Sequence, residues 1–259
     1  MAALFVALVH FPVTDRNGRI VTSAITSLDL HDIARSSRTY GVKAFFVVHP
    51  IPDQRTFAAS VIDHWQTRYG RQFDSRRREA LDLIRVVTDL DEAIVEIERM
   101  EGTRPTIVYT SARALAETER PREAPTALVT AAASPHHHHP PTLLPDGAID
   151  ASAAPPSNQL STRSAASIEV GAETPAESSQ EPGRTASHTA RLGYEDLRAR
   201  LERNDGPPVL LLFGTGFGMA PAMLERADLA LPPVFGPGAY NHLSVRAAAG
   251  IILDRLRGH

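Results

Sequence analysis

The chain has 259 residues, of which 42% are hydrophobic and 22% charged, and it contains no cysteine. A chain without cysteine has no disulfide framework and no zinc or iron–sulfur site with thiolate ligands. The formal net charge of -3 argues against a wholly basic nucleic-acid coat protein and against an acidic tail protein. These values suit one globular domain or two small ones.

Short apolar runs indicate the strands. They lack polar alternation for the most part and cover residues 5–9, 44–48, 84–87, 106–109 and 209–213. Strands buried on both faces have this pattern, and parallel sheets consist of such strands. The first run lacks the basic segment and the cleavage site of a secretory signal. No run approaches the roughly 18 to 20 apolar residues that span a bilayer, so we expect a cytoplasmic protein without a membrane partner.

Apolar residues at helical spacing lie between these runs. The stripes are Leu30, Ile33, Ala34 and Ser37; Phe57, Val61, Trp65 and Tyr69; Leu90, Ala93, Ile94 and Ile97; Tyr194, Leu197 and Leu201; and Val245, Ala249, Ile252 and Leu256, the last on a helix predicted from about Asn241 to Arg257. Strands that alternate with helices predict an α/β fold, with an open parallel sheet and helices on both faces.

Residues 120–190 differ from the rest of the chain. They hold half of its 20 prolines, no aromatic residue, and seven acidic against four basic residues, which accounts for the whole net charge. Leu, Ile, Val and Phe occupy only 8 of these 71 positions. Because so few large apolar residues cannot offset the entropy of ordering, we predict a disordered low-complexity insert between 1–119 and 191–259, which form one domain. Its run His136–His139 fits a metal-binding tract or low-complexity drift; we favour drift and predict no metal site.

A glycine-rich loop follows the predicted strand 209–213, with the sequence Gly214-Thr215-Gly216-Phe217-Gly218. Alternating glycines let the backbone turn sharply and come close to a ligand. The spacing differs from the G-x-G-x-x-G fingerprint of dinucleotide-binding folds, which opens a first helix and has an acidic residue about 20 positions later. Formation of a turn without a ligand is the alternative interpretation.

A second loop, rich in proline and glycine, covers residues 231–238 and leads to Tyr240-Asn241-His242-Leu243-Ser244-Val245. Asn241 is the predicted N-cap of the final helix, and free N–H groups at such a terminus favour a polar or anionic ligand group. Two loops of this kind after successive strands predict a pocket for a nucleoside-like ligand.

These segments, VLLLFGTGFGMAP and PPVFGPGAYNHLSVRAAAGIILDRL, resemble the C-terminal motifs of the SPOUT superfamily of S-adenosylmethionine-dependent methyltransferases. Arg35 stands six residues before the pair Gly41-Val42, as an arginine does in the family's first motif. The chain is similar in particular to the bacterial branch related to the C-terminal region of tRNA (guanine-N1)-methyltransferase. The resemblance implies a C-terminal deep trefoil knot, S-adenosyl-L-methionine as cofactor, tRNA or rRNA as substrate, and a homodimer.

The resemblance also implies the cofactor-binding residues and a role for Arg35, and the other candidates come from helix spacing and local charge. It places the cofactor against Phe213, Gly214, Thr215, Gly216 and Gly218, against Leu231, Pro233 and Gly236, and against Tyr240, Asn241, His242, Leu243, Ser244 and Val245. Arg35 and Asp32 are the candidate catalytic residues, Asp29 is a further candidate base, and Arg16, Arg19 and Arg38 are candidate RNA contacts. Helix capping is the alternative role for Asn241 and Ser244, and a solvated charged face that for Arg35 and Arg38.

Two hypotheses of different classes follow. The leading one is an RNA methyltransferase that acts on a base nitrogen or a ribose 2'-OH. The competing one is a non-catalytic RNA- or protein-binding module that keeps the knotted fold and acts through its insert. Equal numbers of basic and acidic residues outside residues 120–190 motivate it, because strong duplex binding needs a basic surface. A third, an NAD-binding α/β protein, has only the glycine loop in its favour.

Overall fold

The computed structural model describes residues 1–67, 75–113, 189–204, 206–238 and 240–258. All of them belong to one structural unit, formed by Met1–Thr118 and Arg184–His259. Almost all of the predicted insert, including its histidine run, lies outside the described residues, as does Tyr69 of the second predicted helix. The predicted domain boundaries stay a prediction.

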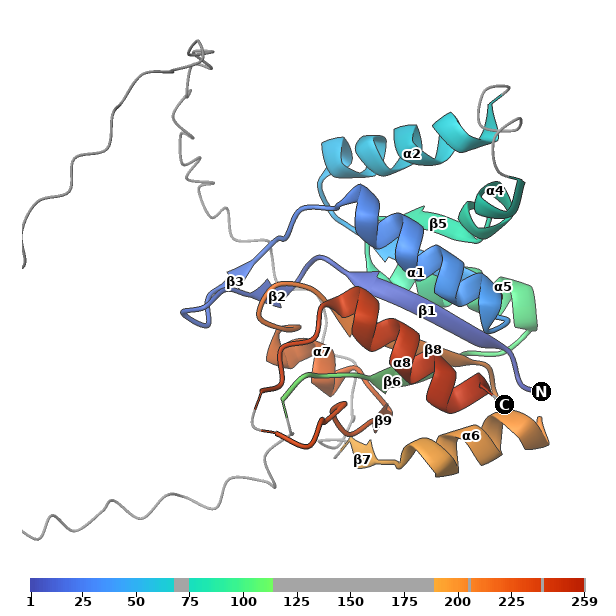
Figure 1. Ribbon diagram of the computed structural model, residues 1–259, viewed down its shortest axis with the longest axis vertical. Helices are drawn as coiled ribbons and strands as arrows, with labels where there is room; N and C mark the ends of the chain where they lie inside the picture. The colour runs from blue at the N-terminus through green and yellow to red at the C-terminus, as the bar shows by residue number, and fades with distance from the viewer. Residues whose placement is uncertain (68–74, 114–188, 205, 239, 259) are drawn as a thin grey trace, which may run out of the picture. The chain divides into compact units, whose positions relative to one another are not determined.

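A parallel sheet forms the centre of this unit (Figure 1). Within the described residues its strand order is β5-β4-β1-β8-β6-β9-β7, and every neighbouring pair is parallel. The strands are β1 (Leu4–Val9), β4 (Ala44–Val48), β5 (Ile84–Val87), β6 (Thr106–Tyr109), β7 (Ala190–Arg191), β8 (Val209–Gly214) and β9 (Leu229–Ala230). The five predicted strands are confirmed. β2 (Val13–Thr14) and β3 (Ile20–Val21) form a separate antiparallel ribbon.

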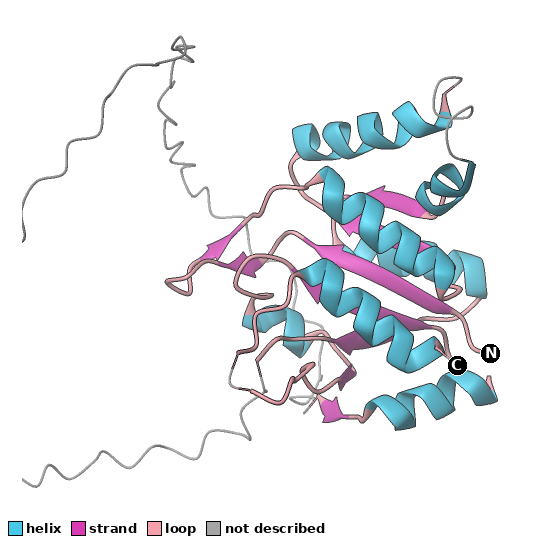
Figure 2. Ribbon diagram, viewed as in Figure 1, coloured by secondary structure: helices cyan, strands magenta, loops and turns pink. Residues whose placement is uncertain are grey.

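Helices cover both faces of the sheet, as the alternating pattern predicts (Figure 2). One face carries α1 (Ser27–Thr39), α2 (Pro52–Gln66), α4 (Ser75–Leu81), α6 (Tyr194–Arg203) and α8 (Val245–Arg257). The other face carries α5 (Leu90–Glu101) and the short α7 (Pro221–Glu225). Among the described residues, no helix combines the length and the apolar character needed to cross a membrane.

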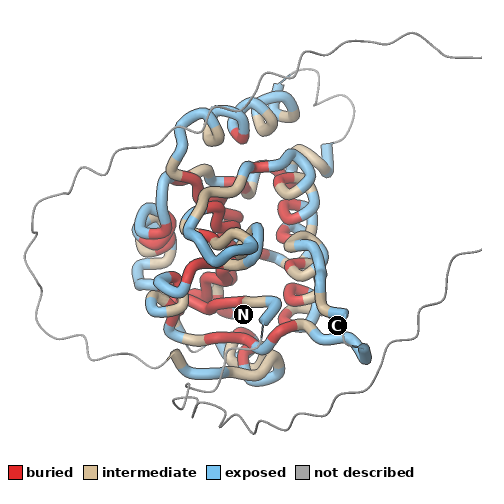
Figure 3. The backbone as a smooth tube through the Cα atoms, turned by 90° about the vertical axis from the view of Figure 1, so that its left-hand side faces the viewer, coloured by how far each residue is buried: buried red, intermediate tan, exposed pale blue. Residues whose placement is uncertain are grey.

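The side-chain alternation of β1 divides the core into two layers. Leu4, Val6 and Leu8 pack with the helices of the first face, and Phe5 and Ala7 pack with α5 and α7. All side chains of β1 are buried, and Figure 3 shows the buried positions gathered along the central strands. Burial on both faces is the reason why the strand has no polar alternation in sequence.

The predicted helical stripes are confirmed most closely in α1 and α5, whose buried residues are the predicted ones. α2 differs, because it packs at the edge of its layer against α4, β5 and α1. Its predicted contact residue Phe57 is 40% exposed, and Ala58 is buried instead. The stripe of α8 packs in the chain's own core, and the homodimer stays a prediction. The trefoil knot stays a prediction.

Candidate functional site

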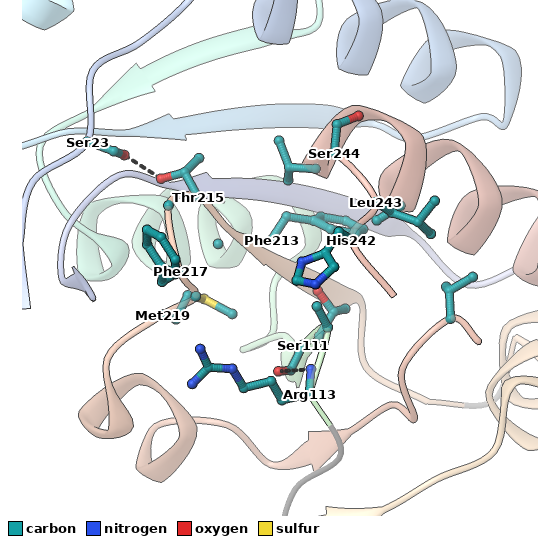
Figure 4. A pocket seen from close by; sticks show the side chains of 18 of the residues that line it. Ser23, Ser111, Arg113, Phe213, Thr215, Phe217, Met219, His242, Leu243 and Ser244 are labelled. Carbon is teal, nitrogen blue, oxygen red and sulfur yellow. Dashed lines mark hydrogen bonds between the residues drawn. The ribbon is translucent and has the colours of Figure 1, made fainter. Parts of the chain in front are cut away.

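A cavity of about 690 Å³ lies at the carboxyl ends of β8 and β6, beside the start of α8. Ligands of parallel α/β sheets bind at this edge, outside the ends of the strands. Its walls are residues 213–219 after β8, Thr110, Ser111, Ala112 and Arg113 after β6, residues 241–245, Ser23, Ala24 and Asp29 before and in α1, and Val234, Ala248 and Ile252. Figure 4 shows Phe217, His242 and Arg113 from three of these segments around one space.

The glycine loop owes its conformation to its glycines. Gly216 and Gly218 have φ angles of 62° and 113°, and the second lies in a region that side chains rarely allow. At Gly214 a Cβ would lie 2.6 Å from Met219 Cγ and 2.9 Å from the Met219 nitrogen. The turn therefore requires glycine, and the same loop lines the cavity; its role in binding a ligand stays a prediction.

The ribbon that follows β1 anchors this loop from outside. The Phe217 N–H donates to the Thr14 carbonyl at 3.1 Å, and the Thr14 N–H donates to the Gly218 carbonyl at 2.8 Å. The Thr14 hydroxyl donates to the same carbonyl at 3.2 Å. The loop is therefore ordered by contacts with a segment about 200 positions earlier in the chain, which reduces the ordering needed when a ligand binds.

The segment before α8 forms the opposite wall, and here the prediction for Asn241 is wrong. The N-cap of α8 is Ser244, whose hydroxyl accepts the Ala247 N–H at 3.2 Å. Asn241 instead donates from its side-chain amide to the Ala112 carbonyl at 2.7 Å. Asparagine and serine are both good N-cap residues. Because residues 241–244 lie outside α8, Ser244 is the one that directly precedes the helix. Asn241 thereby joins two walls of the cavity.

A buried polar network lies behind the glycine loop. His10 Nδ1 is 3.0 Å from the Ser23 hydroxyl, which hydrogen bonds to the Thr215 hydroxyl. Thr215 donates to the Val9 carbonyl at 3.2 Å. Burial lowers the pKa of His10 to about 4, with a further contribution from His49. The pKa of His49 is also lowered, again mainly by burial.

Charged groups occupy two places at the cavity. Asp29, whose side chain is 14% exposed, lines it and lies 3.7 Å from Arg246. The Thr26 hydroxyl donates to the same carboxylate at 2.6 Å. On another wall, Arg113 follows β6 and is exposed. The backbone N–H of Arg113 donates to the Ser111 hydroxyl at 3.0 Å. A carboxylate and a guanidinium thus border one space.

The structure brings most of the predicted cofactor residues to this cavity. Those that line it are Phe213, Gly214, Thr215, Gly216, Gly218, Asn241, His242, Leu243, Ser244 and Val245. Leu231, Pro233, Gly236 and Tyr240 lie in the same loops but outside its lining. Leu231 is buried, and its N–H donates to the Tyr109 carbonyl at 3.0 Å, which fixes the loop to β6.

The predicted catalytic and RNA-contacting residues lie outside the lining. Asp32 is one turn beyond Asp29 and 3.8 Å from Arg246, and Arg35 is exposed further along α1. Arg38 forms an ion pair with Glu79 of α4. Arg16 and Arg19 are exposed in the turn between β2 and β3. Their proposed roles in catalysis and RNA binding stay predictions.

Sequence reasoning did not identify several lining residues, notably Ser23, Ser111, Arg113 and Met219. Residues 110–113 follow the predicted strand 106–109, and the carboxyl ends of neighbouring parallel strands share one edge of a sheet. The pairing of β6 with β8 would therefore have located them. Ser23 had no comparable signal, because it reaches the cavity through an irregular connection between β3 and α1.

A family model described as SAM-dependent RNA methyltransferase matches residues 3–136 and 162–258. The chain is 32% identical over 255 residues to a tRNA (guanine-N(1)-)-methyltransferase of Oleidesulfovibrio alaskensis, a match that covers 98% of this chain and 42% of that protein. It is 29% identical over 253 residues to an uncharacterized protein of Aquifex aeolicus, with 98% and 87% of the two chains covered. The chain spans less than half the length of the first relative.

Among solved structures, TrmJ from Z. mobilis superposes with a TM-score of 0.47 at 11% identity, over 100% of this chain and 69% of that one. The family match covers both motif regions that carry the resemblance in sequence, the glycine loop with the final helix and the segment around Arg35. The chain therefore belongs to the family of SAM-dependent RNA methyltransferases.

Proposed function

We propose that the protein transfers the methyl group of S-adenosylmethionine to tRNA or rRNA in the cytoplasm, and that the cofactor binds in the cavity beside the glycine loop. The observation that carries the proposal is the convergence of the glycine loop, the segment 241–245 and the end of β6 on one cavity. When bound, S-adenosylmethionine supplies an electrophilic methyl group on a sulfonium. The acceptor in the proposal is a base nitrogen or a ribose 2'-OH.

The residues at the cavity fit such a cofactor. A volume of about 690 Å³ lies in the range of sites for ligands of this size. Phe213, Met219 and Ile252 offer apolar surface to a purine, and the hydroxyls of Ser111 and Ser244 offer partners to a ribose. Polar groups on an otherwise apolar wall fix a ligand's orientation.

Asp29 is the candidate proton acceptor that the geometry favours. Of the three residues considered from sequence, Asp29, Asp32 and Arg35, it alone belongs to the lining of this cavity. Thr26 and Arg246 hold its carboxylate in place. Alignment of nucleophile and methyl group accounts for much of such a transfer, and a positioned base adds to it when the acceptor carries a proton.

Arg113 is the candidate anion-binding group of the site. Its exposed side chain borders the cavity from the wall formed after β6 (Figure 4). A guanidinium pairs with a carboxylate or a phosphate through paired hydrogen bonds, so its partner is the carboxylate of the cofactor or the phosphate of an RNA. Arg16, Arg19 and Arg38 are proposed as more distant RNA contacts, and Arg35 as a residue that acts across a homodimer.

Calorimetry with S-adenosylhomocysteine tests the cofactor site, and transfer of tritiated methyl groups to total RNA from a strain that lacks the protein tests the activity. We expect binding by the wild type and methylation of one nucleoside. Gly216→Val should abolish binding, because a side chain at its φ of 62° would also lie 3.2 Å from the Thr14 carbonyl. An absence of binding at millimolar ligand would reject the proposal, and RNA binding without transfer would favour the non-catalytic module.

A matched pair of variants tests the role of Asp29. Asp29→Asn should lower kcat by about 100-fold, the usual contribution of a general base, with little change in affinity for S-adenosylhomocysteine. Asp32→Asn changes the other carboxylate beside Arg246. The side chain of Asp32 is 49% exposed and lies outside the cavity lining, so this variant should keep kcat within about twofold of the wild type. Equal losses in the two variants would contradict the assignment.

A further inference from the structure

Two buried histidines follow the ends of neighbouring strands, and the proposed chemistry uses neither. His10 follows β1 and His49 follows β4, and both are fully buried. Their ring centroids are 5.5 Å apart. Each ring contacts a different polar group of Ser23, the residue that borders the cavity between β3 and α1.

The contacts of Thr215 and Ser23 with Val9 and His10 are all satisfied when the hydrogen bonds run in one direction, starting at His10. Thr215 donates its hydroxyl hydrogen to the Val9 carbonyl, which only accepts, at 3.2 Å. Since a hydroxyl has one hydrogen, Thr215 accepts from Ser23. Ser23 has then no hydrogen left for His10 and accepts from Nδ1–H at 3.0 Å. The hydrogen bonds therefore run from His10 through Ser23 and Thr215 to Val9.

The surroundings of the second ring nitrogen of His10, Nε2, support the same direction of the hydrogen bonds. Nε2 is buried and has no hydrogen-bond partner among the described residues. An N–H there would be a buried donor without an acceptor, which folded proteins rarely contain. The Ser23 hydroxyl also lies 3.5 Å from the His10 carbonyl, and donation to that carbonyl would likewise leave Ser23 to accept from Nδ1–H.

His49 carries its proton on the other nitrogen. Its Nε2–H donates to the Ser23 carbonyl at 3.0 Å, and its Nδ1 accepts the Ile51 N–H at 3.1 Å. One ring therefore holds the hydroxyl of Ser23 and the other holds its carbonyl. His49 is neutral because its Nδ1 accepts a hydrogen bond, and burial, which lowers the pKa of His10 to about 4, keeps His10 neutral as well. The two histidines therefore have complementary tautomers around one residue.

We propose that His10, as the neutral Nδ1–H tautomer, is a positioning residue for cofactor binding: it orients Ser23 so that the Ser23 hydroxyl fixes Thr215 at the start of the glycine loop. The inference rests on the proposed function, because it takes the glycine loop as the cofactor loop. The electrostatic surroundings support it. His49 disfavours a positive charge on His10, and Arg55, which donates to the His49 carbonyl at 2.8 Å, does the same for His49.

Nitrogen-15 spectroscopy of histidine rings tests the tautomers in the full chain. The ring signals missing from His10→Asn identify His10 in the wild type. We expect the pattern of an Nδ1–H tautomer for His10 and of an Nε2–H tautomer for His49. An Nε2–H tautomer at His10 would overturn the direction of the chain and with it the proposal.

Binding of S-adenosylhomocysteine, measured by calorimetry, tests the positioning role. His10→Leu removes the donor, and we expect an affinity about tenfold lower, the effect of one buried hydrogen bond. His10→Asn places an amide N–H near the position of Nδ1 and should restore affinity to within about twofold. In the background of Thr215→Val, which lacks the accepting hydroxyl, His10→Leu should cause no additional loss.

The outcomes separate this inference from the proposed function. If the wild type does not bind S-adenosylhomocysteine, the proposed function fails. If the wild type binds and a folded His10→Leu binds equally well, or if His10→Asn loses as much as His10→Leu, the positioning role is wrong. Where His10→Leu does not fold, Ser23→Ala replaces it, since it removes only the intermediate hydroxyl and should cause the same loss; wild-type affinity in that variant would also refute the role.

Discussion

Acidification should destabilise the fold through His10. Its pKa is 6.5 for the unfolded chain and about 4 in the structure, mainly because of burial. As the pH falls, the unfolded chain therefore binds a proton before the folded one does. The stability contributed by the neutral ring is fully present above pH 6.5 and is lost progressively towards pH 4. The loss is about 1.4 kcal/mol at pH 5.5 and about 3 kcal/mol at pH 4.

Urea unfolding of the wild type and of His10→Asn at about pH 7.5 and about pH 5.5 measures this loss, because asparagine does not titrate. The free energy of unfolding should fall by about 1.4 kcal/mol more in the wild type than in the variant. His49 and His31, whose pKa values are also lowered by burial, titrate in both proteins and cancel. Equal losses in the two proteins would refute the reasoning, since His10 would then titrate alike in both states.

Three further predictions concern stability and are measured by urea unfolding. Ser244→Ala should cost about 1 kcal/mol as the lost N-cap of α8, whereas Asn241→Ala should leave the cap intact; the reverse order would place the cap at Asn241. Gly218→Ala should cost about 1–3 kcal/mol, because Gly218 has a φ of 113°. Gly238→Ala is its control and should be neutral, because a Cβ at Gly238 would have no atom within 4 Å. Leu253→Ala should cost about 2–5 kcal/mol, because Leu253 is fully buried in α8; a smaller loss would show that the site collapses around the change.

The central strands were predictable because their signal is local. β1 and β4 are buried on both faces, so each forms an uninterrupted apolar run in the sequence. β7 and β9 have two residues each, too few for any periodicity, and they exist through parallel pairing with segments far along the chain. A sequence pattern indicates whether a residue is buried, but it does not indicate which distant strand that residue pairs with.

In the candidate site, too, only the residues with a local sequence signal were predictable. The glycine loop was predictable because its conformation depends on residues adjacent in sequence. Arg113 reaches the cavity through the sheet order, in which β8 pairs with β6. Ser23 reaches it through the irregular connection between β3 and α1. The candidates on α1 differ in their position along the helix axis, because Arg35 lies six residues, or about 9 Å, beyond Asp29. Asp29 lines the cavity, and Arg35 does not.

The walls of the cavity are fixed by contacts between segments that are distant in sequence. Thr14 holds one side of the glycine loop and Ser23 holds its start, while Asn241 ties the segment before α8 to Ala112. Each loop alone would lose conformational entropy when a ligand ordered it. Because folding has already ordered the loops, ligand binding does not carry this entropic cost, and the affinity for the ligand is higher. Loss of any one anchor should therefore weaken binding even where the substituted residue never touches the ligand, and bound ligand should in turn stabilise the fold.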